Sequence, residues 1–414
     1  MSLSNITLTA AVRQNLLSLQ GTAELLATTQ GRLATGKKVN SALDNPTNFF
    51  TASGLDARAS DIGNLLDSIG NGVQVLQAAN TGITSLSKLV DTAKSIANQV
   101  LQQPSGYTSK ATVSIAAPAG AGALAVAGTA TDLTNAGTNS LQGKTLVFKT
   151  ASGTTTLTID NTAGAGKVNS IDSINTALTA AGVELTASLN ANGSVTFTSS
   201  NNAASQTITA TGAYAAPPAG SSTSVDVSGT ATFGAVTAAV ADAVSQATRA
   251  NLVTQYNQII TQITTTAQDA SFNGINLLNG DALKLVFNET GKSTVTIAGV
   301  IFNPAGLGLA ALTSGTAFVD NAATNTVLSA LNTASVTLRS QASAFGANLS
   351  IVQIRQDFNK NLINVLQTGS SALTLADTNE EAANSQALST RQSIATSALS
   401  LANQSQQSVL QLLR

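Results

Sequence analysis

Both ends of the chain repeat apolar residues at alternating steps of three and four positions. Over about residues 7–33, the residues that follow this rule are Val12, Leu16, Leu19, Ala23, Leu26 and Leu33. Such a seven-residue repeat predicts a helix with one apolar face that packs against another helix. Gly36 follows, and glycine is the residue most often found just past the end of a helix. We therefore predict a first helix that ends just before Gly36.

A second and longer repeat follows the loop "GKKVNSALDNPTNFF". It holds one register over five heptads, and Asn80 occupies one position of the seam. The apolar members are Leu55, Ala59, Ile62, Leu66, Ile69, Val73, Leu76, Ile83 and Val90. The repeat ends before Pro104, so about 48 residues at ~1.5 Å each predict a helix roughly 70 Å long. A helix of this length is expected to lie against other long helices.

The centre of the chain, about residues 105–240, has a different pattern. The stretches "KTLVFKT" and "TTTLTID" alternate like strands, whereas "SIDSINTALTAAG" has a helical start signal and helical spacing. The stretch "VELTASLNANGSVTFTSS" reads as two strands joined by Asn-Gly, a strong hairpin signal. The pattern predicts a ββαββ unit within a looser surround rich in Ser, Thr, Gly and Ala.

Helical periodicity returns near residue 245, with Leu252, Tyr256, Ile259 and Ile263 on one face. After "DASFNGINLLNG", the segments "LKLVF" and "TVTIAGV" predict a hairpin. A long helix is predicted over about residues 321–367, with one apolar face formed by Val327, Leu331, Ala334, Leu338, Phe345, Leu349 and Val352. The last predicted helix, about residues 380–413, has an apolar stripe of Ile394, Ala398, Leu401 and Leu412.

These elements predict a mainly α fold with an inserted α+β region. The N- and C-terminal arms form a long antiparallel helical bundle or coiled coil, and the sheet-rich middle domain projects from it. The expected segments are an N-terminal helix with a joint, a long helix, the middle domain, a helix with a hairpin, a second long helix and a C-terminal helix. Their bounds are 1–45, 46–104, 105–240, 241–320, 321–376 and 377–414.

Composition narrows the possible functions. Of the 414 residues only 9% are charged and the net charge is −1, so the chain lacks the basic patches that bind nucleic acid or anionic membranes. It contains no His and no Cys, which excludes a Ser-His-Asp triad, thiol catalysis, disulfides and the usual zinc sites. The start "MSLSNITLTAAV" lacks the features of a cleaved signal, and the uncharged run at 111–131 is too weakly apolar to span a bilayer.

The acidic cluster of Asp377, Glu380 and Glu381 is the strongest candidate for a catalytic or metal site. We interpret it instead as a helix N-terminus, where carboxylates meet unpaired N–H groups and the positive end of the helix dipole. No pair of carboxylates suited to hydrolysis stands out in the middle domain. We therefore expect no enzyme activity, no cofactor and no metal.

Three separated segments resemble bacterial flagellins, in the order that family has them. They are "GRLATGKKVNSALDNPTNFFTASGLDARASDIGNLLDSIGNGVQVLQAAN", "SFNGINLL" and "LADTNEEAANSQALSTRQSIATSALSLANQSQQSVLQLLR". The resemblance covers about residues 1–103, 245–300 and 320–414. It implies a filament subunit whose terminal helices form an inner tube, whose long helices form an outer tube and whose middle projects outward. One departure is that the large insertion precedes the helix at 245–269, whereas in well-known flagellins it follows the equivalent helix and hairpin.

The resemblance assigns assembly roles to particular residues. The expected inner-tube set is Val12, Leu16, Leu19, Leu26, Leu33, Ile394, Ala398, Leu401, Val409 and Leu412. The expected outer-tube set is Leu55, Ile62, Leu66, Ile69, Val73, Leu76, Ile83, Leu331, Leu338, Phe345, Leu349 and Phe358. The residues Asn40, Asp44, Asn45 and Pro46 favour a turn between helices, and the resemblance adds the compatible interpretation of a joint between the two tubes.

The resemblance also implies partners and a location. We expect a homopolymer in the extracellular filament of a bacterial flagellum, with hook-associated junction and cap proteins, an export chaperone and the flagellar type III export apparatus as further partners. Many flagellins carry an Arg-x-Arg-x-Leu-type patch read by a Toll-like receptor. The stretch "DTAKSIANQ" has Thr92, Lys94 and Ile96 there, so we expect weak receptor activation. The alternatives are a hook–filament junction protein, or a flagellin whose middle domain is also a surface adhesin.

Overall fold

The computed structural model describes residues 10–115, 133–134, 141–162, 164–190 and 194–412. It divides into two compact units, each assembled from separated parts of the chain. The first unit comprises Met1–Val73, Lys284–Thr296 and Ser350–Arg414, and the second comprises Gln74–Leu283 and Ile297–Leu349. Two long helices, α2 (Pro46–Gln102) and α5 (Asn321–Thr374), contribute to both units.

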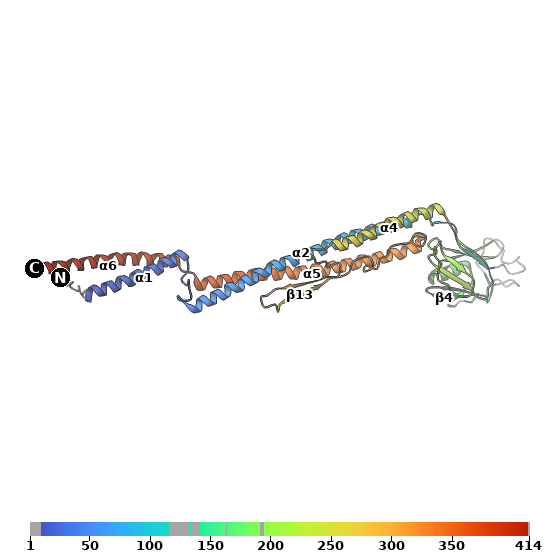
Figure 1. Ribbon diagram of the computed structural model, residues 1–414. Helices are drawn as coiled ribbons and strands as arrows, with labels where there is room; N and C mark the ends of the chain where they lie inside the picture. Colours follow the sequence, from blue (N-terminus) through green and yellow to red (C-terminus); the bar gives the residue numbers. More distant parts are fainter. Residues whose placement is uncertain (1–9, 116–132, 135–140, 163, 191–193, 413–414) are drawn as a thin grey trace. The chain divides into compact units, whose positions relative to one another are not determined.

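In the first unit the two terminal helices form an antiparallel pair. Helix α1 (Ala10–Thr35) and helix α6 (Thr378–Leu412) lie side by side and contact each other (Figure 1). The beginning of α2 and the end of α5 pair in the same way, and Ala59, Ile62 and Leu366 are buried between them. The sequence therefore predicted both helical pairs, since each apolar repeat found a helical partner.

The structure extends α2 at its start, to 57 residues. The side chain of Asn45 accepts a hydrogen bond from the backbone N–H of Asn48 at 3.0 Å, which makes Asn45 the N-cap. Pro46 then occupies the first helical position, where its missing N–H costs nothing. The heptad pattern begins only at Leu55, so this first part of the helix lies outside the periodic signal, although the expected segment 46–104 includes it.

One seam position of α2 was predicted wrongly. Asn80 is exposed, and Ala79 is fully buried in its place. The buried positions Leu76, Ala79 and Ile83 are separated by three and then four residues. Because the half-buried Val73 also lies three residues before Leu76, two steps of three follow one another. A three-residue discontinuity of this kind shifts the apolar face around the helix.

The helical part of the second unit is α4 (Ala243–Asp269) with the adjoining parts of α2 and α5. Tyr256 of α4 lies in its core, edge-to-face with Phe318 at 5.9 Å between ring centroids, and burial raises the pKa of Tyr256 to about 12. The segment "SFNGINLL" follows α4, and the side-chain amide of Asn276 donates to the carbonyls of Ala267 and Gln268. This segment therefore satisfies carbonyl groups at the end of α4 that have no helical partner.

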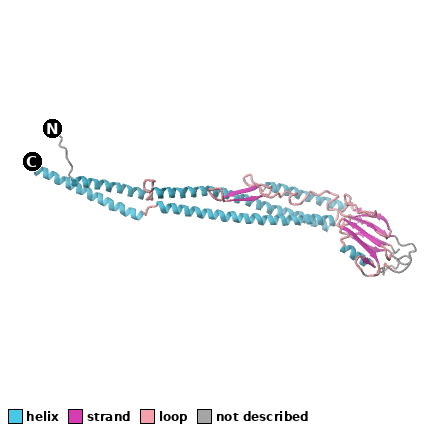
Figure 2. Cartoon of the chain, turned by 90° about the horizontal axis from the view of Figure 1, so that it is seen from below, coloured by secondary structure: helices cyan, strands magenta, loops and turns pink. Residues whose placement is uncertain are grey.

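The strands between α2 and α4 lie in the second unit, and those that the structure describes form three sheets. Their bounds are β1 (Tyr107–Ser109), β2 (Thr112–Ile115), β3 (Thr145–Thr150), β4 (Gly153–Ile159), β5 (Lys167–Val168), β6 (Leu185–Leu189), β7 (Val195–Ser199), β8 (Thr207–Thr209), β9 (Ser224–Ser228), β10 (Phe233–Thr237) and β11 (Val240–Ala241). One sheet has the order β5-β4-β3-β9-β8, another β10-β2-β7-β6, and β1 pairs with β11. Figure 2 shows these strands gathered with the short helix α3 (Ile171–Ala180).

The two larger sheets and α3 share one apolar core. Phe148 of the five-stranded sheet meets Phe197 of the four-stranded sheet edge-to-face at 5.4 Å, and Ile174 and Leu178 of α3 pack on the same cluster. The expected strands and helix of the ββαββ unit are present. Its two strand pairs fall in different sheets, β3 and β4 in one and β6 and β7 in the other, which the sequence pattern did not specify. The described part of the supposedly loose surround adds β1, β2, β5 and β8 to β11.

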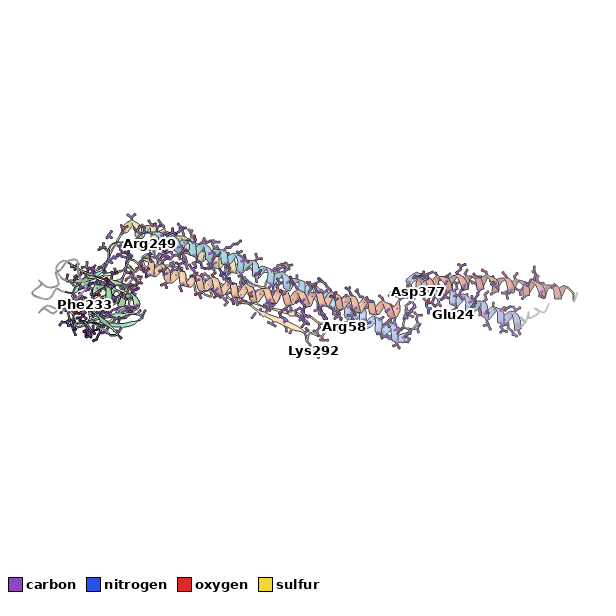
Figure 3. The ribbon with its side chains drawn as sticks, turned by 180° about the vertical axis from the view of Figure 1, so that it is seen from behind. Glu24, Arg58, Phe233, Arg249, Lys292 and Asp377 are labelled. Atoms are coloured by element: carbon purple, nitrogen blue, oxygen red, sulfur yellow. The ribbon has the colours of Figure 1, made fainter. Side chains whose placement is uncertain are left out.

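A buried polar cluster joins these sheets to the helices of the second unit. Asp320, fully buried, caps α5 by accepting from the Ala323 N–H at 3.0 Å. Its other oxygen accepts from the backbone N–H and hydroxyl of Ser205 and from the hydroxyl of Ser222. The guanidinium of Arg249 (Figure 3), 1% exposed, donates to the carbonyls of Pro104 and Phe318. The entry of the chain into the sheet region at Pro104 and the contact between the sheets and the start of α5 are therefore held by buried hydrogen bonds.

The predicted hairpin is β12 (Ala282–Val286) and β13 (Thr294–Ala298), which pair with each other. In the first unit its tip is bound to α2 by an ion pair between Arg58 and Glu289, with N and O 2.7 Å apart. The side chain of Asn359 in α5 donates to the carbonyl of Phe287 at 3.0 Å. The hairpin is thus fastened to both long helices.

Candidate assembly surfaces

The C-terminal helix α6 carries an apolar stripe that no other described residue covers. Ile394 is 64% exposed and Leu401 is 69% exposed, with exposed Ala398 between them. Thr390, Ser393 and Ser397 lie beside these residues on the same open side of α6. Large contiguous apolar surfaces of this kind are typical of protein interaction sites.

The face of α6 that is partly covered is a different one. Its half-buried residues recur at steps of four and three and are Ser385, Leu388, Gln392, Ala395, Leu399 and Ala402. At ~100° per residue this face lies about 120° around the helix from the stripe of Ile394, Ala398 and Leu401. Helix α1 therefore packs on the former face and leaves the predicted stripe open.

The inner-tube residues predicted on α1 fall into two groups. Val12 is buried, and Leu19 and Leu26 are half-buried, as expected for a face that meets α6. Leu16 and Leu33 are exposed. The side chains predicted at Val409 and Leu412 lie outside what the structure describes.

The outer-tube residues predicted from sequence lie mostly inside one chain. Those that are buried are Ile62, Ile69, Leu76, Ile83, Leu331, Leu338 and Phe345. Those that are half-buried are Leu55, Leu66, Val73 and Leu349. Phe358 of α5 is exposed. Most of this set therefore stabilises the fold of one chain, and Phe358 is available to a neighbour.

Sequence reasoning missed the surface on which Phe358 lies. Ile351, Ile354, Phe358 and Val365 are exposed apolar residues at steps of three, four and seven along α5. Their spacing is itself helical, so the signal was present in the sequence. It was overlooked because the repeat of Leu331, Leu338 and Phe345, continued by Leu349 and Val352, already gave this helix an apolar face.

The predicted joint between the helical pairs is a hydrogen-bonded crossing of two chain segments. The N–H groups of Lys38 and Val39 donate to the carbonyl of Thr374, and the N–H of Ala376 donates to the carbonyl of Gly36. Gly36 has a positive φ of 69°, a conformation that glycine adopts without strain. The two segments that link α1 with α2 and α5 with α6 are therefore bonded to each other.

The side chains predicted for this joint close its turn. The carboxylate of Asp44 accepts from the N–H groups of Asn40 and Ser41, both at 2.9 Å. These hydrogen bonds, that from Ser41 first and that from Asn40 second, lower the pKa of Asp44. Next to this turn Leu43 is 96% exposed. The turn interpretation is confirmed, and Leu43 is an apolar residue in the joint that the sequence pattern did not single out.

The acidic cluster at the start of α6 acts as a helix N-terminus, which confirms that interpretation. The carboxylate of Asp377 (Figure 3) accepts from the N–H groups of Asn379 and Glu380 at 2.9 and 3.3 Å. Glu381 pairs with Arg32 of α1, with O and N 3.3 Å apart. These groups tie the two terminal helices together where they leave the joint.

Comparison with known proteins gives a consistent family assignment. Residues 6–131 match the model of the bacterial flagellin N-terminal helical region, and residues 328–413 match that of the bacterial flagellin C-terminal helical region. The two matches together cover about half of the chain. The chain belongs to the bacterial flagellin family.

Individual flagellins match this chain over 165 to 176 residues. The chain is 33% identical over 165 residues to flagellin FljM and 32% identical over 165 residues to flagellin FljK, both of Caulobacter vibrioides. It is 28% identical over 176 residues to a flagellin of Brucella melitensis. These alignments cover 39% to 40% of this chain and 59% to 62% of the relatives. Among the helices of the described residues, none has the length and apolarity needed to cross a membrane.

Proposed function

We propose that the chain is a structural subunit that polymerises into the filament of a bacterial flagellum and thereby serves swimming motility. The observation that carries the proposal is the open stripe of α6, formed by Ile394, Ala398 and Leu401. The membership in the flagellin family supports it. In this proposal copies of the terminal helices from neighbouring subunits cover the stripe.

The energetics favour assembly by burial. Removing a large aliphatic side chain such as Ile394 or Leu401 from water stabilises a contact by about 1.5–3 kcal/mol. With a net charge of −1, the chain offers little repulsion between packed copies. When the same interface repeats by a rotation that does not close, an open helical polymer results.

The proposal extends to the other partners that the family suggests. We propose export in an unfolded state through the flagellar type III apparatus with a chaperone, followed by contact with hook-associated junction and cap proteins at the filament ends. A chain without cysteine suits this route, since no disulfide has to form. The location proposed on this basis is extracellular.

Truncation tests the central claim. Removal of residues 400–414 takes away Leu401 and the rest of the C-terminal end of α6. We expect loss of filaments, measured by electron microscopy and sedimentation, while circular dichroism still reports a folded second unit. Normal filaments from the truncated chain would contradict the proposal. A truncated chain that unfolds altogether would also contradict it, since the C-terminal end of α6 would then be part of the fold.

We also propose weak activation of the flagellin-sensing Toll-like receptor. Within the predicted patch on α2, Thr92 is exposed, Lys94 is half-buried and Ile96 is 7% exposed. None of the three is an arginine, so this surface cannot offer the bidentate hydrogen bonds of an Arg-rich patch. A reporter-cell assay should give a response well below that of a flagellin with the Arg-x-Arg-x-Leu-type patch, and an equal response would refute the prediction.

A further inference from the structure

Strand β6 is the longest regular edge of the two larger sheets, among the strands that the structure describes. It ends the sheet of order β10-β2-β7-β6 and runs for five residues in unbroken register with β7. The other edges are short or irregular, since β5 has two residues, β8 has three and the pairing of β10 shifts register between Phe233 and Val236. Unpaired backbone groups along a regular edge are a template for pairing with another chain, whereas short strands and bulges disrupt that template. Of these edges, β6 is therefore the one that needs another form of protection.

The backbone groups on the outer side of β6 belong to alternate residues. The carbonyl of Glu184 accepts a hydrogen bond from the N–H of Ser200 at 3.0 Å. The N–H of Asn190 donates to the carbonyl of Ser194 at 2.9 Å. Since antiparallel strands bond to one another through alternate residues, the even-numbered residues between these two points bond to β7. Ala187, midway between them, therefore directs its N–H and its carbonyl away from β7.

A side-chain amide of helix α3 bonds to both of these groups. The Oδ1 of Asn175 accepts from the N–H of Ala187 at 2.6 Å, and the Nδ2 of Asn175 donates to the carbonyl of Ala187 at 3.1 Å. A residue of an added strand would offer Ala187 the same pair of groups, one acceptor and one donor. The amide of Asn175 therefore takes the place that a strand from another chain would occupy at the centre of this edge.

The packing of α3 holds this amide at the edge. Ile174 and Leu178 are fully buried and anchor the helix in the apolar core that the two sheets share. At the start of the helix, the hydroxyl of Ser170 accepts from the N–H of Ser173, and the hydroxyl of Ser173 accepts from the N–H of Ser170. Asn175 directly follows Ile174, so it lies ~100° around the helix from that anchor, beside β6.

We propose that Asn175 blocks the edge of β6 and thereby prevents β6 from pairing with β6 of a second copy of this chain. A second copy is the partner that fits, because two identical edges can pair antiparallel about a two-fold axis. The need for such a block rests on the proposed function, since a filament holds many copies of the middle region close together. The pairing itself depends only on the edge of β6 and can be measured without filaments.

The test measures self-association of the full-length chain by sedimentation velocity, below the concentration at which the parent forms filaments. The variant Asn175→Ala removes the amide and places a better helix former in α3, so the helix itself is not weakened. We expect the parent to stay monomeric and the variant to associate at least tenfold more tightly. In the monomer of the variant, the amide hydrogen of Ala187 should exchange with solvent at least tenfold faster than in the parent.

Three further variants separate loss of the block from loss of stability. Thr176→Ala changes an exposed neighbour on α3 and should leave the chain monomeric. Val227→Ala removes buried methyl groups from β9, in the other sheet, and should lower the thermal midpoint without causing association. Thr186→Lys adds a charge on the exposed side of β6, so its combination with Asn175→Ala should restore the monomer.

The proposal fails if the Asn175→Ala chain folds and stays monomeric, because the amide would then only fasten α3 to the sheet. It also fails if Val227→Ala associates as strongly, since general destabilisation would then be the cause, or if Thr186→Lys leaves the association unchanged. If Asn175→Ala does not fold, Asn175→Ser takes its place in every comparison. A parent chain that forms no filaments at any concentration would contradict the proposed function, and this comparison of variants would still decide the role of Asn175.

Discussion

In a chain with few aromatic residues, the terminal helix pair and the two-sheet middle region bury their apolar side chains in opposite ways. The middle region closes its core within one chain, where Phe148 and Phe197 meet between the sheets. The α1–α6 pair covers one face of each helix and leaves Ile394 and Leu401 in water. The middle region is thus complete by itself, whereas the helix pair has unused apolar surface. Their difference teaches that exposed apolar area, and not apolar content, marks the part of this chain that needs neighbours.

The sharpest way to break this comparison is to make the open stripe polar. The double variant Ile394→Gln/Leu401→Gln removes two side chains whose burial is worth about 1.5–3 kcal/mol each, so the critical concentration for polymerisation should rise by about two to four orders of magnitude. Sedimentation at a series of protein concentrations measures it.

The matched control for the stripe is Ser389→Gln/Ser400→Gln, which adds the same side chain at two exposed positions on another face of α6. It should polymerise like the parent. Equal critical concentrations for the stripe variant and this control would show that the stripe lies outside the interface.

A smaller effect, on the free energy of unfolding, is expected from disrupting the buried polar cluster that joins the sheets to the helices. Replacing Asp320 with Ala removes the cap of α5 and leaves the hydroxyls of Ser205 and Ser222 without their acceptor, which should cost about 2–4 kcal/mol. Chemical denaturation monitored by circular dichroism measures the loss. Asp172→Ala, at an exposed position in the first turn of α3, is the control and should change stability by about 0.5 kcal/mol or less. If both variants unfold at the same denaturant concentration, Asp320 does not hold the two parts together.

The smallest effect on assembly is expected from deleting the middle region. Strands β1 and β11 pair antiparallel, with Tyr107 opposite Ala241, so removal of residues 112–237 leaves two chain ends that already lie together and need only a short linker. The α6 stripe is untouched, and electron microscopy should show filaments of the shortened chain. If the shortened chain folds and yet forms none, the middle region takes part in assembly and the contrast drawn above fails.

The sequence predicted the helices well because their apolar repeats are long and each has a helical partner. It did not decide which face of α6 meets α1, since Leu388, Ala395 and Leu399 form one apolar face and Ile394, Ala398 and Leu401 another. Both faces are similarly apolar, and only the position of α1 decides which is covered. Periodicity cannot supply that information, because the choice depends on a helix more than 340 residues away in the chain.

The strands of the middle region show a second limit. The segments that became β8 and β9 are built from Ser, Thr, Val and Ile with one Asp, and their burial depends on strands distant in the sequence. The pairing of Asp320 with Ser205 and Ser222 joins residues about 100 positions apart and leaves no local pattern. The hairpin of β12 and β13, with a short connection and alternating residues, was predicted correctly for the opposite reason.

The crossing at the joint has a mechanical consequence. If a single chain segment joined two rigid helix pairs, the pairs could rotate freely relative to each other, because rotation about the backbone bonds of the segment meets little resistance. Here two chain segments cross together, and the hydrogen bonds from Lys38 and Val39 to Thr374 and from Ala376 to Gly36 hold them side by side. Turning one helix pair relative to the other would break these bonds, so the crossing transmits a twisting moment between the pair of α2 with α5 and the pair of α1 with α6.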